Sequence, residues 1–222
     1  RRVLFRSVIL MGEYLQALYE TLLMVGVSSI FSIAIGLPLG IVLVLTQPNG
    51  IKPIKTLYRV LDIIINLFRS LPFIILIIVF APLALILTGR SSGTMALTVP
   101  LSLAAIPFVA RIMETSINEV GQGVVEAALA MGTSIPQLIT RVLIPEAMPA
   151  LIQGVTTTII NIIGYSAMAG VIGGGGLGDL AIRWGYYNRQ TEALLIAVIL
   201  IVILVQAVQL VGNALSRAID HR

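Results

Sequence analysis

The sequence of 222 residues contains no cysteine and has few charged side chains. Without cysteine the chain forms no disulfide, performs no thiol catalysis and offers no Cys-ligated metal site. Charged residues make up only 11% of the chain, whereas hydrophobic residues make up 58% and the mean hydropathy is +1.03. A soluble domain of this size is not so apolar, so the composition predicts an integral membrane protein.

Catalytic motifs are also scarce. Ser166 lies in a Gly-Tyr-Ser-Ala sequence, but the only histidine, His221, lies beyond the last apolar run. Ser166 therefore lacks a histidine to act as its general base, and a serine protease is disfavoured. No G-x-x-x-x-G-K-[ST] phosphate loop occurs, which argues against ATP hydrolysis by this chain. Residues 173–178 match G-x-G-x-x-G, but no strand precedes them, so we interpret them as a bend in an external loop over residues 170–190. We therefore predict no catalytic residue, no metal site and no cofactor in this chain.

Five long apolar runs predict an all-α membrane protein with a single transmembrane domain over residues 1–222. Helices satisfy their backbone hydrogen bonds internally, whereas barrel strands would alternate apolar and polar residues. We expect spans at residues 21–45, 57–88, 95–113, 147–172 and 193–213, with a loop over residues 114–146. Residues 1–20 mix charged and apolar side chains and favour a helix that lies in the membrane interface.

The second run is longer than one crossing needs, and residues 71–88 are its fully apolar part. Asp62, Asn66 and Arg69 are spaced four and three residues apart, which puts them on one helical face. Protein or water, not lipid, should meet that face. A structural polar stripe is the favoured interpretation over a direct role in transport.

The stretch EAALAMGTSIPQLITRVLIP, residues 126–145, lies between apolar runs and predicts two short helices joined by a bend. Glu126 is expected to open the first helix, where a carboxylate suits the positive end of the dipole. Gly132 can take the left-handed conformation that ends a helix. Ser134 followed by Gln137 is typical of a capping box for the second helix.

The same stretch resembles the EAA loop of ABC-importer permeases, whose pattern is E-A-A, three residues, G, nine residues, I-x-L-P. Only Val142 and Ile144 depart from it, both conservatively. The resemblance implies a cytoplasmic coupling helix that docks on an ATPase; an ordinary amphipathic loop helix is the alternative. The residues implied in ATPase coupling are Glu126, Ala127, Ala128, Met131, Gly132, Val142, Ile144 and Pro145.

Three further stretches resemble the permeases of methionine ABC importers. They are residues 66–76 (NLFRSLPFIIL), residues 105–111 (AIPFVAR) and Gly164-Tyr165-Ser166-Ala167-Met168 leading into residues 173–178. The resemblance implies the type I ABC importer permease fold, a homodimer of five-span subunits in the bacterial cytoplasmic (inner) membrane, and alternating access driven by ATP. It also implies two cytoplasmic ATPase subunits that bind ATP and Mg²⁺, and a substrate-binding lipoprotein outside.

Tyr165, Ser166 and Met168 stand out by polarity and size in a run of small residues, so we expect them near the translocation path or its external gate. Simple helix packing explains the same pattern nearly as well. Two other functions stay open at this point. One is a permease for another small solute, such as an osmolyte or polar amino acid, and the other is an ATP-independent channel or transporter.

The distribution of cations predicts the orientation of the chain in the membrane. Segments expected in the cytoplasm carry seven cations and external loops carry three, so we expect the N-terminus outside and the C-terminus inside. Arg1, Arg2 and Arg6 count against an external N-terminus. The position implied for the EAA-like loop outweighs them, since that loop must face the ATPase.

Overall fold

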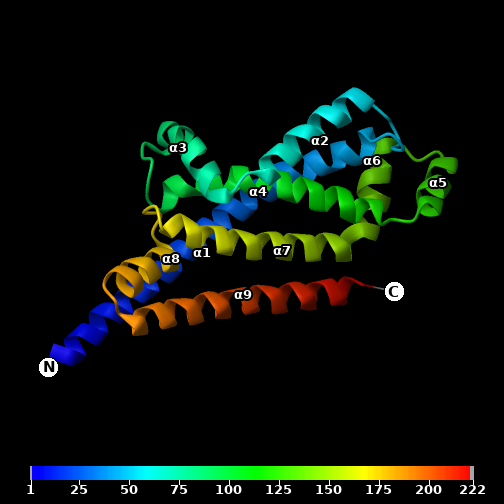
Figure 1. The fold of residues 1–222 in the computed structure, drawn as a ribbon. Helices are drawn as coiled ribbons and strands as arrows, with labels where there is room; N and C mark the ends of the chain where they lie inside the picture. The colour runs from blue at the N-terminus through cyan, green and yellow to red at the C-terminus, as the bar shows by residue number, and fades with distance from the viewer. Residues whose placement is uncertain (1, 221–222) are drawn as a thin grey trace. The chain divides into compact units, whose positions relative to one another are not determined.

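The computed structural model describes residues 2–220, and the side chains of residues 11–220. That part of the chain is helical throughout, without strands (Figure 1). Its long helices are α1 (Arg2–Thr46), α4 (Thr94–Asn118), α7 (Ile144–Gly170) and α9 (Thr191–Ile219). Among the described residues, four helices are long and apolar enough to cross a membrane, or up to five if the bent pair α2 and α3 counts as one span.

The range predicted as the second span is divided into α2 (Lys55–Ser70) and α3 (Phe73–Thr88). Pro72 causes the break, because it has no backbone N–H to donate and disfavours helical geometry at the residue before it. Pro72 instead stands as the N-cap of α3. The fully apolar part predicted at residues 71–88 corresponds to α3.

The N-terminal residues do not form a separate interfacial helix. They continue without a break into α1, which runs through Pro38 to Thr46. Residues 13–24 are mostly Glu, Leu, Gln, Ala and Met, which are good helix formers, and nothing in them ends a helix. The start of the first span predicted at residue 21 therefore does not coincide with the start of a helix.

The fourth helical run begins well before the predicted residue 147. The helix α6 (Ile135–Leu138) passes through a π-helical turn, η1 (Ile139–Leu143), directly into α7. In that turn the N–H of Ile144 bonds to the carbonyl of Ile139, five residues back. Pro145 follows at once, and a local π-helical turn accommodates its missing donor without ending the helix.

The glycine-rich stretch predicted as an external loop forms α8 (Gly176–Leu180) and the π-helical turn η2 (Ala181–Tyr187). Gly173, Gly175 and Gly176 all have φ near +80°, which confirms the predicted bend. The bend is held against α1, because the N–H of Gly176 donates to Glu20 Oε2 at 2.7 Å and the N–H of Leu177 donates to Thr21 Oγ1 at 2.9 Å.

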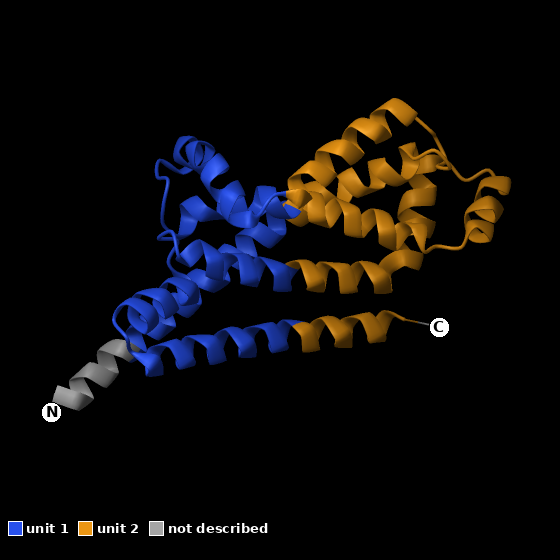
Figure 2. Cartoon of the chain, viewed as in Figure 1, with its two compact units in different colours: residues 1–31, 71–105, 159–208 blue, residues 32–70, 106–158, 209–222 orange. Residues whose placement is uncertain are grey.

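The chain divides into two compact units, each assembled from separated segments (Figure 2). Unit 1 comprises residues 1–31, 71–105 and 159–208. Its main core includes Met24, Ile77, Leu101 and Ile162, and a smaller cluster packs α8 and η2 around Leu177.

Unit 2 comprises residues 32–70, 106–158 and 209–222 and contains the EAA-like stretch. Its larger cluster joins α1, α4, α5 (Gln122–Ala130), α6 and α7. A second cluster joins α1, α2 and α4 through Leu43, Ile65 and Ala110. The larger cluster therefore includes residues of both the EAA-like stretch and α4.

Candidate functional site

Residues 122–143 form a bent segment made of α5, a turn at Gly132, α6 and η1, which continues into α7 (Figure 1). Gly132 has φ +78°, and the N–H of Thr133 donates to the carbonyl of Ala128 at 3.2 Å across the turn. Only glycine takes this conformation without strain from a Cβ. The predicted order of helix, glycine bend and helix is thus confirmed, although the second helix continues into α7.

The start of the first helix in the bent segment differs from the prediction. The helix α5 begins at Gln122 after Gly121, so Glu126 is its fifth residue and lies outside the first turn. Gln122 to Val125 have helical geometry as well, and they extend the helix toward the N-terminus. The carboxylate of Glu126 therefore does not act on the N-terminal dipole.

Ser134 begins α6 as predicted. Gln137 Oε1 accepts from the backbone N–H of Ser134 at 3.1 Å and from its hydroxyl at 2.9 Å. The Gln137 side chain thereby satisfies the N-cap backbone donor, as a capping box requires. Local hydrogen bonds on both sides of the bend thus define its shape.

The residues implied in ATPase coupling differ in exposure. Glu126 and Ala127 are exposed and Met131 is 80% exposed, which leaves a surface for a partner. Ala128 is buried in the cluster that contains Leu138 and Leu143, so its small side chain lets α5 pack closely on α6 and η1. Toward α7 the segment is partly covered: Val142 and Ile144 are half-buried and Pro145 is exposed.

Tyr165, Ser166 and Met168 point to different surroundings within unit 1. The ring of Tyr165 stacks on Phe73 with centroids 4.4 Å apart. Ser166 is buried and its hydroxyl donates to the carbonyl of Ile163 at 2.8 Å. Met168 is 43% exposed. Tyr165 and Ser166 thus contribute to packing, and Met168 is the member of the three most open to its surroundings.

A polar network between α2 and α4 includes Asp62 and Asn66 from the predicted stripe, within unit 2. Arg111 Nη2 donates to Asp62 Oδ1 and, at 3.2 Å, to Asn66 Oδ1. Arg111 Nη1 donates to Glu114 Oε2 at 2.6 Å. Protein meets the stripe, as predicted for these two residues. The sequence alone did not identify Arg111 and Glu114 as partners, although their spacing of three residues was a signal for an ion pair.

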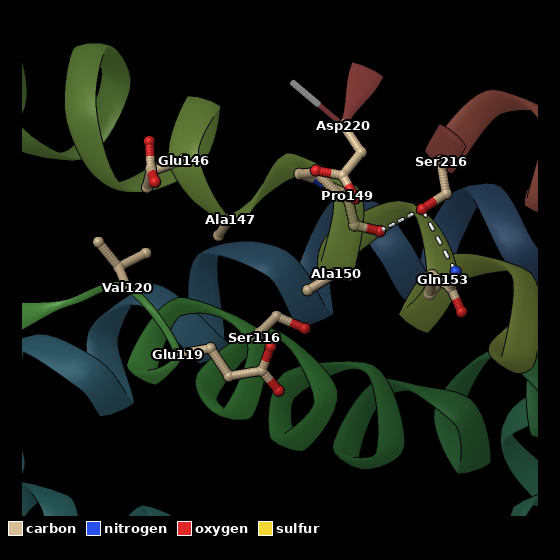
Figure 3. Close-up of a pocket in the computed structure, with 10 residues that line it drawn as sticks. All are labelled: Ser116, Glu119, Val120, Glu146, Ala147, Pro149, Ala150, Gln153, Ser216 and Asp220. Carbon is tan, nitrogen blue, oxygen red and sulfur yellow. Dashed lines mark hydrogen bonds between the residues drawn. The ribbon is translucent and has the colours of Figure 1, made fainter. Parts of the chain in front are cut away.

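A pocket of about 410 Å³ lies in unit 2 between the end of α4, the start of α7 and the end of α9 (Figure 3). The Ser216 hydroxyl donates to the carbonyl of Pro149 at 3.1 Å and accepts from Gln153 Nε2 at 3.3 Å. Within the described residues, no group of three or more His, Cys, Asp or Glu side chains could hold a metal ion. The hydrogen bonds of the pocket join the end of α9 to α7. The lining residues are Ser116, Glu119, Val120, Glu146, Ala147, Pro149, Ala150, Gln153, Ser216 and Asp220.

Residues 36–222 match the family described as binding-protein-dependent transport system inner membrane component. The chain belongs to this family. It is 42% identical to a probable D-methionine transport system permease protein of Vibrio cholerae. The match covers 94% of this chain and 92% of the relative. A protein of the same description from Pasteurella multocida is 44% identical over 91% of this chain and 94% of its own.

The fold of this inner membrane component matches a solved structure of the MetNI methionine ABC transporter in an inward-facing conformation. The TM-score is 0.93 at 40% identity, over 95% of this chain and 98% of the other. The all-α fold of type I ABC importer permeases that the sequence resemblance implied is therefore confirmed.

Proposed function

We propose that this chain is the membrane-spanning permease subunit of an ATP-driven importer and that it translocates methionine by alternating access. The observation that carries the proposal is the identity above 40% to D-methionine permeases over nearly the whole chain. The EAA-like bent segment, with its exposed Met131 and its glycine turn, supports the dependence on an ATPase.

In the proposed complex two copies of this chain associate with two cytoplasmic ATPase subunits, which bind ATP and Mg²⁺. A binding lipoprotein delivers the solute from outside. A twofold pair of subunits encloses a path with two equivalent coupling sites, which one subunit alone does not. The bent segment and the C-terminus then lie on the cytoplasmic side and the N-terminus outside.

The bent segment is proposed to dock on the ATPase through its exposed residues Glu126, Ala127 and Met131. Gly132 and the buried Ala128 hold its shape, while Val142, Ile144 and Pro145 join it to α7. When ATP closes the ATPase dimer, the two bent segments are drawn together and the cavity opens outward. Hydrolysis reverses the movement.

For the translocation path, Met168 is the residue that we propose to lie at the path or its gate in the dimer, because it is exposed in the single subunit. Tyr165 and Ser166 are proposed to support that region, since the Tyr165 ring stacks on Phe73 and the Ser166 hydroxyl donates to the carbonyl of Ile163.

The test is reconstitution in proteoliposomes with the ATPase and the binding protein of the same transport system. We expect uptake of labelled methionine that requires ATP, and no comparable uptake of labelled leucine. A variant ATPase that binds but does not hydrolyse ATP is the control. Uptake without any ATPase would favour a channel, and ATP-driven uptake of a different solute would leave the permease function intact but overturn methionine.

A further inference from the structure

Five side chains form a polar link between α2 and α4, which we call the Arg111 clamp: Tyr58, Asp62, Asn66, Arg111 and Glu114. Arg111 donates from one nitrogen to Asp62 and Asn66 on α2 and from the other to Glu114 on its own helix. The hydroxyl of Tyr58 on α2 donates to the second oxygen of Glu114 at 3.1 Å. The clamp therefore crosses between the helices in both directions.

The clamp is enclosed at Glu114 and more open on the α2 side. The Glu114 side chain is 5% exposed and Arg111 Nε is buried without a hydrogen-bond partner among the described residues, whereas the Arg111 and Asp62 side chains are 21% and 32% exposed and Asn66 is exposed. Charge-assisted hydrogen bonds are stronger where water is partly excluded, and removing Arg111 would leave the buried Glu114 carboxylate without its ion-pair partner. The clamp thus differs from an exposed surface ion pair, whose contribution is small.

The same part of α4 carries the bent segment on a different face. Val109, Met113 and Ile117 belong to the cluster that contains Ala128, Leu138 and Leu143. At about 100° per residue, the mean direction of Arg111 and Glu114 lies about 130° around α4 from the mean direction of those three residues. Within unit 2, α4 therefore shares an apolar cluster with the bent segment on one side and binds α2 through the clamp on another.

Apolar contacts hold α2 less completely than the clamp does. Ile65 is the buried apolar residue of α2, whereas Leu57, Val60, Ile64 and Leu67 are exposed. The helix also ends at Ser70, before the break at Pro72, so α3 does not continue its direction. Without the clamp, the small cluster around Ile65 would be the main restraint on α2.

We infer that Arg111 is a positioning residue that makes α2 follow α4 when the bent segment moves, so that these three elements move as one body. The inference rests on the proposed function, because ATP supplies the movement. A cluster of packed residues transmits displacement on one face of α4, and a partly buried charged link transmits it on the other.

The variant D62N/N66A removes the carboxylate and the amide by which α2 binds Arg111. It leaves the Arg111–Glu114 pair and the hydrogen bond from Tyr58 to Glu114 intact, so Arg111 keeps one carboxylate partner. R69Q is the matched control, since Arg69 lies on the same helix and predicted face as Asp62 and Asn66. The chain has no cysteine, so a spin label at a single introduced cysteine is free of background. Ile63 on α2 and Val124 on α5 are exposed and accept labels.

Distances between labels on the two copies are measured with the ATPase, with and without ATP. In the protein with an unmodified clamp and in R69Q, we expect ATP to change the distance between labels at both sites. In D62N/N66A we expect the Val124 shift to persist and the Ile63 shift to be lost, with an intermediate shift in D62N alone. An undiminished Ile63 shift in D62N/N66A overturns the inference. No Val124 shift in the unmodified protein overturns the proposed function itself.

A rescue experiment separates positioning from general stability. In the D62N/N66A background a cysteine pair at Ile65 and Ala110, which share one buried cluster, links α2 to α4 when oxidised. We expect the amount of methionine moved per ATP to fall several-fold in D62N/N66A, to recover on oxidation and to fall again on reduction. Failure of the formed disulfide to restore it would contradict the positioning role.

Discussion

Gly132 shows how one residue determines the shape of the bent segment. It has φ +78°, and a Cβ built on it meets no described atom within 4 Å. The cost of a side chain at this position is therefore conformational and not steric. L-residues pay roughly 1–2 kcal/mol in the left-handed region, β-branched ones being among the least tolerant and Asn among the most.

Gly132→Val should uncouple transport, because valine is strained in the left-handed conformation that forms the bend. Gly132→Asn is the matched variant and should keep most of the activity. The measurement is ATP-driven uptake together with the ATPase rate in proteoliposomes. Equal uptake by the valine variant and the unmodified protein would refute the role of the bend.

Met168 allows a test of the translocation path. Met168→Arg should impair transport because a bulky charge enters a weakly polar path, while the ATPase stays bound because Met168 is not part of the bent segment. Uptake and copurification of the ATPase are measured on the same preparation. The control is Met168→Leu, which conserves volume and should be well tolerated. Normal uptake by the arginine variant would count against the proposed gate.

At the scale of elements, two glycines let α1 approach α4 closely within unit 2. A Cβ on Gly36 would lie 2.6 Å from Val109 Cβ, and one on Gly40 would lie 2.5 Å from Met113 Cβ and 2.7 Å from the Ala110 carbonyl oxygen. Glycines four residues apart are typical of close helix pairs in membranes. The backbone oxygen cannot move aside as a flexible side chain can.

Gly40→Ala should therefore destabilise the protein by about 1–3 kcal/mol, as overpacking of a tight core does. Gly26→Ala on the same helix is the control, because its Cβ would meet no described atom within 4 Å. Thermal unfolding of the purified permease in detergent is the measurement. If both variants unfold at the same temperature, the contact between α1 and α4 is less tight than the structure indicates.

Several elements were predictable from local sequence. The glycine bend, the Ser134 cap and the apolar runs follow from backbone conformation, side-chain hydrogen bonding and hydropathy, all of which act over a few residues. The starts of α5 and α7 were not, because a helix extends until something stops it. Neither Gln122–Val125 nor the π-helical turn at Ile139–Leu143 contains a stop that is recognisable in isolation.

At the scale of the whole molecule, the proposed function requires a defined orientation in the membrane. Introduced cysteines at Met131 and Tyr186, both exposed, should react with a membrane-impermeant maleimide from opposite sides. In intact spheroplasts we expect Tyr186→Cys to be labelled and Met131→Cys to be protected until the membrane is opened. Labelling of Met131→Cys from outside would place the bent segment on the wrong side for an ATPase.

The sequence by itself determined the class of protein, because long apolar runs and a polar island with fixed spacing are one-dimensional properties. Hydropathy and the conformational freedom of glycine depend on a few adjacent residues, so they can be assessed without the tertiary structure. Tertiary structure alone decided that Arg111 meets Asp62 and Asn66, that Ala128 is turned inward and that Gly40 lies against α4. These are contacts between residues up to 73 positions apart, as Gly40 and Met113 are, and such contacts depend on how helices pack.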